Sequence, residues 1–393
     1  MLVGDGMADY PIEKLGGKTP LEYASTPNMD EVVNLGCTGR VSTVPQGYTP
    51  GSDVANMSLM GYDPSLYYRG RAPIEAVSMG ISLKEGDVAF RCNLVTLKEG
   101  RMLDYSAGHI GTDEGGELVS LLHKELGSDK VRFYPGVGYR HLMVTKGIGG
   151  ELACVPPHDI TDQPIGEHLP AGEHKDPIVN IMQKAREILA DAKVNEKRLQ
   201  AGKNPATDIW LWGQGPSLTL PTLEERFSLT GSVISAVDLV RGLGRLAGLG
   251  VRLVEGATGY LGTNYAGKVG AAREAFGNGE DFVYLHVEAP DETSHEGSLE
   301  KKIQAIEEFD TYVVGEMLKY QQSRNDMRII VLPDHETPLS LKTHSAGPVP
   351  WGACGLGIGS DDAGAYNEKT AKDRKPFTGP SLFESFIRGD LQK

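Results

Sequence analysis

Apolar runs and amphipathic segments alternate over the second half of the chain. Strand-like runs lie at residues 209–212, 251–254, 282–287 and 329–332, and helical segments lie between them at residues 237–247 and 299–320. This strand–helix alternation predicts a doubly wound α/β domain.

The first half of the chain has a different texture. Up to about residue 80 it consists of Gly- and Pro-rich turns around a few short elements. Beyond residue 87 we predict strands at 88–97, 131–134 and 141–144, a helix at 115–126, a loop at 156–177 and one long helix at 176–200. Asp5 follows an apolar start that would belong to the same sheet as the later strands. We therefore expect one α/β domain made from residues 1–82 and 206–393, with a second α/β (α+β) domain inserted at residues 83–205.

The bulk composition is ordinary for a soluble globular protein, but the charge is not balanced. Of 393 residues, 39% are hydrophobic and 23% are charged, and the formal net charge is −14. Nucleic acid and anionic membranes are themselves negative, so neither is expected to be the main partner. An anionic substrate would need a local positive site made of metal ions or clustered Arg and Lys. The sequence carries no signal for an oligomeric state.

Several features favour a cytoplasmic protein. Cys37, Cys92, Cys154 and Cys354 are widely spaced, which suits a reducing compartment and neither a disulfide framework nor a cysteine-based zinc site. No apolar run approaches the roughly 20 residues needed to span a membrane, and no signal peptide is visible. Because only three residues precede Gly4, the first strand is expected either to be short or to begin before the given start.

Metal-binding side chains collect just past the predicted strands. They are Asp5 after the apolar start, Asp291 and His295 after the run 282–287, and Asp334, His335 and His344 after the run 329–332. In an open parallel sheet, ligands bind outside the carboxyl ends of the strands. Taken singly, each residue suits a turn or a surface loop. The occurrence of the whole set at strand ends favours a shared site.

The mixture of carboxylates and imidazoles indicates the kind of ion. It suits Zn or Mn better than Ca, which prefers oxygen ligands alone. The set is too large for one tetrahedral ion and suits two ions that share a substrate. We therefore predict two divalent cations, with Mn or Zn ahead of Co or Mg.

One serine stands at the start of a predicted helix. Pro50 and Gly51 form a turn, and Ser52 or Asp53 is expected to cap the helix that follows. A helix start favours a phosphate group, because it offers free N–H groups and a positive dipole end. A serine hydroxyl is a weak nucleophile at neutral pH, but coordination to a divalent cation can deprotonate it. Ser52 is therefore either a cap or a metal-activated nucleophile.

With these residues in view, the chain resembles the archaeal-type branch of cofactor-independent phosphoglycerate mutases, in the alkaline phosphatase superfamily. The resemblance covers essentially the whole chain. Its most specific parts are Gly4-Asp-Gly-Met-Ala-Asp9, Pro50-Gly-Ser-Asp-Val-Ala-Asn leading to Gly70-Arg-Ala-Pro-Ile-Glu75, His286-Val-Glu-Ala-Pro-Asp-Glu-Thr-Ser-His295 and Pro333-Asp-His-Glu-Thr337. The short start before Gly4 departs from the family pattern. So does Thr293-Ser294, where relatives often carry small residues.

The resemblance implies an alkaline-phosphatase-like sheet and specific roles for individual residues. One metal would be held by Asp5, Asp334, His335 and the nucleophile Ser52, and the other by Asp291, His295 and His344. The inserted domain would close over the larger one and hold the carboxylate and phosphate of the substrate. The substrate-binding candidates are Arg91, His109 and Arg140 in the inserted domain and Lys268 in the larger one.

The activity that the resemblance implies is interconversion of 3-phosphoglycerate and 2-phosphoglycerate, a step of glycolysis and gluconeogenesis. It would proceed through a phosphoserine at Ser52, without 2,3-bisphosphoglycerate. The alternatives keep the metal site and change the phosphate acceptor, as in a homoserine kinase-like enzyme or a phosphatase. A binding protein without turnover is disfavoured, because no expected ligand position has lost its residue.

Overall fold

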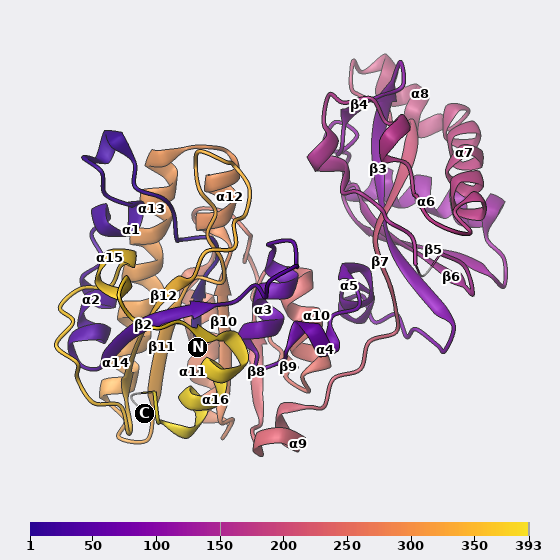
Figure 1. Cartoon of the computed structure of the whole chain (residues 1–393). Coiled ribbons are helices and arrows are strands. Elements are labelled where there is room, and N and C mark those ends of the chain that lie inside the picture. Colours follow the sequence, from indigo (N-terminus) through magenta and orange to yellow (C-terminus); the bar gives the residue numbers. More distant parts are fainter. Residues whose placement is uncertain (150, 392–393) are drawn as a thin grey trace. The chain divides into compact units, whose positions relative to one another are not determined.

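Strand pairing divides the chain into two units. A computed structural model describes residues 1–149 and 151–391. Its strands form two separate sheets, shown in Figure 1. One unit comprises Met1–Tyr68 and Leu220–Lys393, and the other comprises Arg69–Thr219. The predicted α/β class is confirmed. Along the chain, the second unit lies between the two parts of the first.

The first unit is built on an eight-stranded sheet of order β13-β2-β12-β11-β1-β10-β8-β9. Its strands are β1 (Leu2–Gly4), β2 (Cys37–Ser42), β8 (Gly231–Ile234), β9 (Gly250–Val251), β10 (Phe282–Val287), β11 (Arg328–Leu332), β12 (Val349–Gly355) and β13 (Phe377–Thr378). The run from β11 to β9 is parallel throughout, and β12 is antiparallel to both of its neighbours. The short β1 lies between β11 and β10, at the centre of the parallel part.

Helices cover both faces of this sheet. They are α1 (Pro20–Tyr23), α2 (Pro27–Asn34), α3 (Ser52–Leu59), α4 (Pro64–Tyr67), α9 (Leu223–Phe227), α10 (Asp238–Leu246), α11 (Tyr265–Gly277), α12 (Ala289–His295), α13 (Leu299–Phe309), α14 (Gly315–Gln322), α15 (Glu368–Ala371) and α16 (Gly379–Arg388). A π-helical segment, Asp310–Val314, joins α13 to α14, and a 3₁₀ turn lies at Glu13–Leu15. Helices α2, α11 and α14 pack on strands of the sheet around one apolar core, and α3, α10 and α16 form a second group. The central parallel strands carry apolar side chains on both faces, so each face must be covered by helices to keep water away.

The parallel strands bring distant residues to one edge of the sheet. Gly4 at the end of β1 pairs with Val287 at the end of β10, and Val3 pairs with Leu332 at the end of β11. The three strands therefore finish at the same level, and the residues that follow them meet there.

The second unit contains an antiparallel sheet in which β3 lies between β6 and β7. Its elements are α5 (Arg71–Ser78), β3 (Asp87–Lys98), β4 (Arg101–Asp104), α6 (Thr112–Leu126), β5 (Val131–Val137), β6 (Arg140–Lys146), α7 (Asp176–Ala190), α8 (Lys193–Gln200) and β7 (Asp208–Pro216), with 3₁₀ turns at Pro157–Ile160 and Gly166–His168. Helices α6 and α7 share one apolar core with the sheet, and α5 packs on β3 and β7.

The boundaries of the two units differ from the predicted ones. The strand predicted at residues 209–212 exists as part of β7, but it pairs with β3 and not with the larger sheet, where we had expected it. Residues 69–82 also join the second unit, because Ala72 and Ala76 of α5 pack against Ala89, Leu142 and Val144. An apolar run predicts a strand but does not predict which sheet it joins.

Two predicted elements are shorter than expected. The strand at residues 251–254 is reduced to Gly250–Val251, which pair with Ser232 and Val233 of β8. The single helix at 176–200 is broken into α7 and α8 at Ala192, which has an extended backbone. Asn195 stabilises the break, since its amide bonds Leu189 O at 2.8 Å and both the N–H and the C=O of Ala206 at 2.9 and 2.7 Å.

Among residues 1–149 and 151–391, no helix combines the length and apolar character that crossing a bilayer requires.

Replacing Asn195 with Ala should destabilise the second unit. The buried N–H and C=O of Ala206 would lose their partners, and an unsatisfied buried polar group costs about 1–3 kcal/mol. Urea denaturation should show this loss, whereas Glu196→Ala, on the exposed side of the same helix, should leave the free energy of unfolding unchanged. Equal stability of the two variants would contradict the role given to Asn195.

Candidate metal centre

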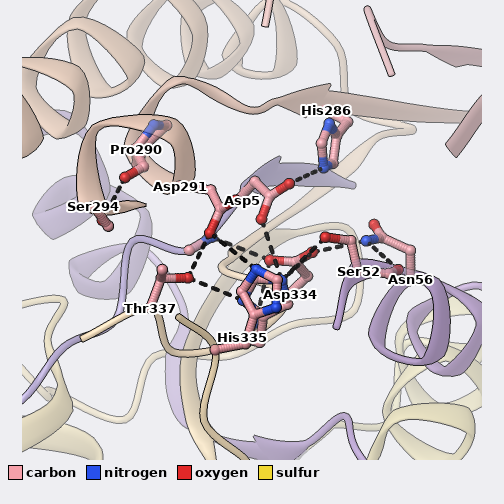
Figure 2. Close-up of polar contacts among 12 residues, drawn as sticks. Asp5, Ser52, Asn56, His286, Pro290, Asp291, Ser294, Asp334, His335 and Thr337 are labelled. Atoms are coloured by element: carbon pink, nitrogen blue, oxygen red, sulfur yellow. Dashed lines mark hydrogen bonds and ion pairs between the residues drawn. The ribbon is translucent and has the colours of Figure 1, made fainter. Parts of the chain in front are cut away.

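The predicted metal-binding residues of the first unit meet at the carboxyl edge of its sheet. Asp5 directly follows β1, Asp334 and His335 follow β11, and Asp291 and His295 lie in α12, which follows β10. Ser52 is the first residue of α3, and His344 lies in the loop between β11 and β12. Figure 2 shows Asp5, Ser52, Asp291, Asp334 and His335 pointing toward one another.

The first group of atoms converges on His335. Its Nε2 lies 3.1 Å from Ser52 Oγ, 3.5 Å from Asp5 Oδ1 and 3.5 Å from Asp334 Oδ2. Asp5, Asp334 and His335 are buried. Two carboxylates, one imidazole and one hydroxyl thus share a small volume, as the resemblance implied.

The second group converges in the same way. Asp291 Oδ2 lies 3.1 Å from His295 Nε2, Asp291 Oδ1 lies 3.6 Å from His344 Nε2, and the two imidazole Nε2 atoms are 3.1 Å apart. His295 Nδ1 donates to the carbonyl of Lys342 at 2.9 Å, so its Nε2 carries the lone pair in a neutral ring. These three residues offer one ligand atom each, all within 4.8 Å of one another.

Thr337, the last residue of the Pro333-Asp-His-Glu-Thr337 motif, connects the two groups, a role that the motif alone did not indicate. Its Oγ1 donates to Asp291 Oδ1 at 2.6 Å and lies 3.2 Å from His335 Nδ1, as Figure 2 shows. Because the hydroxyl proton is used on Asp291, Oγ1 accepts from His335 Nδ1–H. His335 Nε2 is then unprotonated and directed at Ser52 and Asp5. A hydrogen bond of this kind is the usual means of orienting a metal-binding histidine.

Asp334 is oriented by contacts to both of its oxygens. Oδ1 accepts from the backbone N–H groups of Gly6 and His335 at 3.1 and 2.9 Å, and Oδ2 accepts from Asn56 Nδ2 at 2.7 Å. Asn56 lies in α3 one turn beyond Ser52, and its Nδ2 also donates to Ser52 O. Asn56 therefore couples the start of α3 to the loop after β11.

His286 is a second residue that the sequence analysis left without a role. It lies inside β10, and its Nε2 is 3.1 Å from Asp5 Oδ2, while Ser235 Oγ is 3.3 Å from its Nδ1. Burial lowers the pKa of His286 to about 4, so its ring is neutral. A histidine within a strand that is otherwise apolar was the available signal.

The expected helix cap at Ser52 is wrong. Gly51 occupies the capping position, and Ser52 is the first helical residue. No side chain caps the helix, so neither Ser52 nor Asp53 has the predicted role. Asp53 bonds the N–H of Val54 and the hydroxyl of Tyr68 instead. The Ser52 hydroxyl is therefore turned toward His335 and is not used to stabilise the helix.

The electrostatics of the first group favour a bound cation. Burial raises the pKa of Asp5 well above its usual range, and the carboxylates of Asp334 and Asp291 raise it further. Asp5 Oδ1 and His286 Nε2 are buried and make no hydrogen bond to any described residue. A divalent cation fits this donor set, because it supplies the missing charge and the missing partner together.

The second group shows the same demand for positive charge. Burial is the largest single influence and would lower the pKa of His295, but the hydrogen bond and charge of Asp291, together with the Lys342 carbonyl, outweigh it and raise the pKa to about 9. Burial likewise favours neutral Asp291, yet the bonds to His295 and His344 hold its pKa well below its usual range. A proton on His295 thus balances Asp291, and a divalent cation at the shared Nε2 position would replace that proton.

Lys268, on α11, contacts the backbone of β10. It is buried and its Nζ donates to the carbonyl of His286 at 2.9 Å. Burial lowers the pKa of this lysine to about 8.

Arg91, His109 and Arg140 lie in the second unit, on β3, in the loop after β4, and on β6. Arg91 is buried, bonds Glu75 at 2.9 Å and packs over the ring of Trp212 at 4.3 Å. Burial lowers its pKa to about 10. Arg71 bonds the same Glu75 at 3.0 Å, a contact that the sequence analysis did not predict.

His109 sits in an unusual backbone. Ala107, Gly108 and His109 have consecutive φ values of 50°, 66° and 47°, in the left-handed region that non-glycine residues rarely adopt. Asp104 holds this turn by accepting from Gly108 N, and Arg198 holds it by donating to Ala107 O at 2.6 Å. Strain that is held in place in this way is common at functional sites.

Divalent metal should stabilise the chelator-stripped protein against unfolding. A ligand present at 100 times its dissociation constant contributes about 2.7 kcal/mol per site. We expect Mn²⁺ to raise the midpoint of thermal unfolding in the wild type and in Asp373→Asn, which changes an exposed carboxylate. Asp5→Asn should lose much of that gain. An equal gain in both variants would exclude Asp5 as a ligand.

Comparisons with known proteins show which family this chain resembles. A family model described as 2,3-bisphosphoglycerate-independent phosphoglycerate mutase matches residues 34–195. A protein of that name from Methanosarcina barkeri is 51% identical over 375 residues, which cover 95% of this chain and 94% of the relative.

Two solved structures share the fold. A protein from Pyrococcus horikoshii has a TM-score of 0.82 and 28% identity, covering 100% of this chain and 97% of that one. A cofactor-independent phosphoglycerate mutase from Thermoplasma acidophilum has a TM-score of 0.65 and 24% identity, covering 99% and 98%. With half of its residues identical to a relative over nearly its whole length, the chain belongs to the family of 2,3-bisphosphoglycerate-independent phosphoglycerate mutases.

Proposed function

We propose that this chain interconverts 3-phosphoglycerate and 2-phosphoglycerate by passing the phosphoryl group through Ser52. The observation that carries the proposal is the placement of Ser52 Oγ, 3.1 Å from His335 Nε2 and beside two buried carboxylates. The name shared by the relatives supplies the substrate, and the geometry supplies a nucleophile.

Two divalent cations are part of the proposal. Asp5, Ser52, Asp334 and His335 would hold one, and Asp291, His295 and His344 the other. Mn²⁺ or Zn²⁺ suits these donors best, ahead of Co²⁺ and Mg²⁺. When bound, the cations lower the pKa of the serine hydroxyl and neutralise charge on the transferring phosphoryl oxygens.

The phosphoryl group changes its oxygen partner twice. Ser52 Oγ forms a bond to phosphorus as the bond from phosphorus to the glycerate oxygen breaks, which gives phosphoserine and glycerate. The glycerate then presents its other hydroxyl, whose oxygen forms the new bond to phosphorus as the Ser52 Oγ–P bond breaks. The positive end of α3 begins at Ser52 and favours the phosphate at that position.

Neighbouring residues hold the nucleophile in place. Asn56 fixes both the carbonyl of Ser52 and Asp334, so the serine and its acidic neighbour move together. Thr337 directs the lone pair of His335 Nε2 toward Ser52. This preorganisation limits the rearrangement needed when phosphate arrives.

Cationic side chains are proposed to bind the anionic groups of the substrate. Arg91, His109 and Arg140 in the inserted domain and Lys268 in the larger one are the candidates. An Arg guanidinium pairs with carboxylate or phosphate through two parallel hydrogen bonds. Glu75 holds Arg91 in one orientation, and the turn at Ala107 presents His109.

The compartment we propose is the cytoplasm, where glycolytic enzymes act.

Ser52→Ala should abolish mutase activity, because the alanine has no oxygen to accept phosphate. We expect production of 2-phosphoglycerate from 3-phosphoglycerate, followed through coupled enolase with Mn²⁺ present, to fall by at least about 1,000-fold. Ser323→Ala, on the exposed surface, is the matched control and should keep full activity.

The same assay separates the proposal from its rivals. Full activity in Ser52→Ala would exclude the phosphoserine route. Wild-type protein that released inorganic phosphate from 3-phosphoglycerate without making 2-phosphoglycerate would be a phosphatase. Transfer of phosphate from ATP to homoserine, with no mutase activity, would favour the kinase-like alternative.

A further inference from the structure

Lys302 is a fully buried lysine that the proposed chemistry does not use. It lies on α13, the helix that follows α12 and its ligands Asp291 and His295. Its Nζ makes three hydrogen bonds: to Asp9 Oδ2 at 2.8 Å, to the carbonyl of Thr337 at 2.9 Å and to the carbonyl of Ala8 at 3.3 Å. All three protons of the ammonium group are therefore used.

The three acceptors belong to the two loops that carry the first ligand group. Ala8 and Asp9 lie in the loop that starts with Asp5, and Thr337 lies in the loop that carries Asp334 and His335. The loops are also joined directly, since Thr337 N donates to Ala8 O at 3.1 Å and Leu339 N donates to Asp9 Oδ2 at 3.1 Å. Lys302 lies where these bonds meet.

Thr337 makes this junction relevant to both ligand groups. Its carbonyl accepts from Lys302, while its hydroxyl contacts Asp291 of the second group and His335 of the first. A shift of the Thr337 backbone would therefore move one ligand in each group. Asp9 and Thr337, like Lys302, are buried, so water cannot replace a lost contact.

Charge adds to this geometry. Burial lowers the pKa of Lys302, but Asp9 and, more weakly, Asp291 favour its charged form. The ammonium group thus adds a positive charge next to Asp9 and within electrostatic range of Asp291.

We propose that Lys302 is a positioning residue of the metal centre, which acts through the Thr337 backbone to set the geometry of His335 and Asp291. The inference rests on the proposed function, because it assumes that these residues bind metal. Within residues 1–149 and 151–391, Lys302 makes no hydrogen bond to a candidate ligand, and its bond to the Thr337 carbonyl is the contact that leads to both ligand groups.

The competing role is purely structural. A buried ion pair can serve folding alone, and removing one partner then lowers stability by leaving an uncompensated charge. Such a residue would change the unfolding midpoint and leave the metal affinity of the folded protein unchanged. Metal affinity measured on folded protein therefore separates the two roles.

The experiment is a Mn²⁺ titration of chelator-stripped protein by calorimetry, at a temperature where circular dichroism shows every variant to be folded. Loss of a residue that orients metal ligands typically weakens metal binding by about 10- to 100-fold, and we expect this for Lys302→Met. Lys319→Met, on the exposed part of α14, is the matched control and should bind Mn²⁺ like the wild type. Wild-type affinity in Lys302→Met would overturn the inference.

A double-mutant cycle tests the path through Thr337. Thr337→Val removes the hydroxyl and keeps the shape of the side chain, so it should also weaken Mn²⁺ binding. If Lys302 acts through Thr337, adding Lys302→Met to Thr337→Val should weaken binding by a smaller factor than Lys302→Met does in the wild type. Two independent, multiplying losses would contradict the proposed path.

A second variant covers the case in which Lys302→Met is unstable, and the wild type separates failure of the metal centre from failure of this inference. If Lys302→Met does not fold, the double replacement Lys302→Met with Asp9→Leu removes both charges of the pair, and its Mn²⁺ affinity decides the question. Wild-type protein that binds no Mn²⁺ would contradict the proposed metal centre. Wild-type binding with an unchanged affinity in the folded Lys302 variant would contradict this inference alone.

Discussion

The larger unit must balance the electrostatic repulsion among three buried carboxylates, and most features of its site follow from this. Asp5, Asp291 and Asp334 come from three separate segments and meet at one edge of the larger sheet, nearly without solvent. Isolated buried carboxylates are costly, so such a cluster persists only with nearby positive charge. Strand order enforces the cluster, because β11, β1 and β10 are adjacent and parallel and end at the same level.

The residues around the three carboxylates offer ligand atoms for a cation or fix the carboxylate oxygens by hydrogen bonds. Imidazole nitrogens from His335, His295 and His344 provide ligand atoms that a cation can share with the carboxylates. Asn56 and Thr337 supply hydrogen bonds that fix individual oxygens. Further out, the three bonds of Lys302 join the loops that carry the ligands. Each layer restricts the one inside it, which is how a site of this charge keeps a single geometry.

The sequence predicted this edge of the sheet well because both of its signals are local. An apolar run predicts a buried strand, and the polar residues directly after it must lie at that strand's end. The role of His286 could not be predicted, because it lies within such a run. Its contact with Asp5 depends on the pairing of β10 with β1. The roles of Thr337 and Asn56 could not be predicted either, because Thr and Asn are common in loops and helices, and only tertiary contacts distinguish them.

The errors in the fold have the same origin. The run at residues 209–212 is apolar enough for either sheet, and only its antiparallel pairing with β3 decides. Ser52 is the first helical residue and not the cap, a difference of one position that local propensity does not resolve. The break between α7 and α8 depends on Asn195 bonding Ala206, eleven residues away, so periodicity alone predicted one helix.

If the carboxylate cluster binds two cations, one of them beside Ser52, the ions should be visible by anomalous diffraction from crystals grown with Mn²⁺. We expect two anomalous peaks per chain, one among Ser52, Asp5, Asp334 and His335 and the other among Asp291, His295 and His344. A single peak, or none at the Ser52 position, would contradict the two-cation proposal.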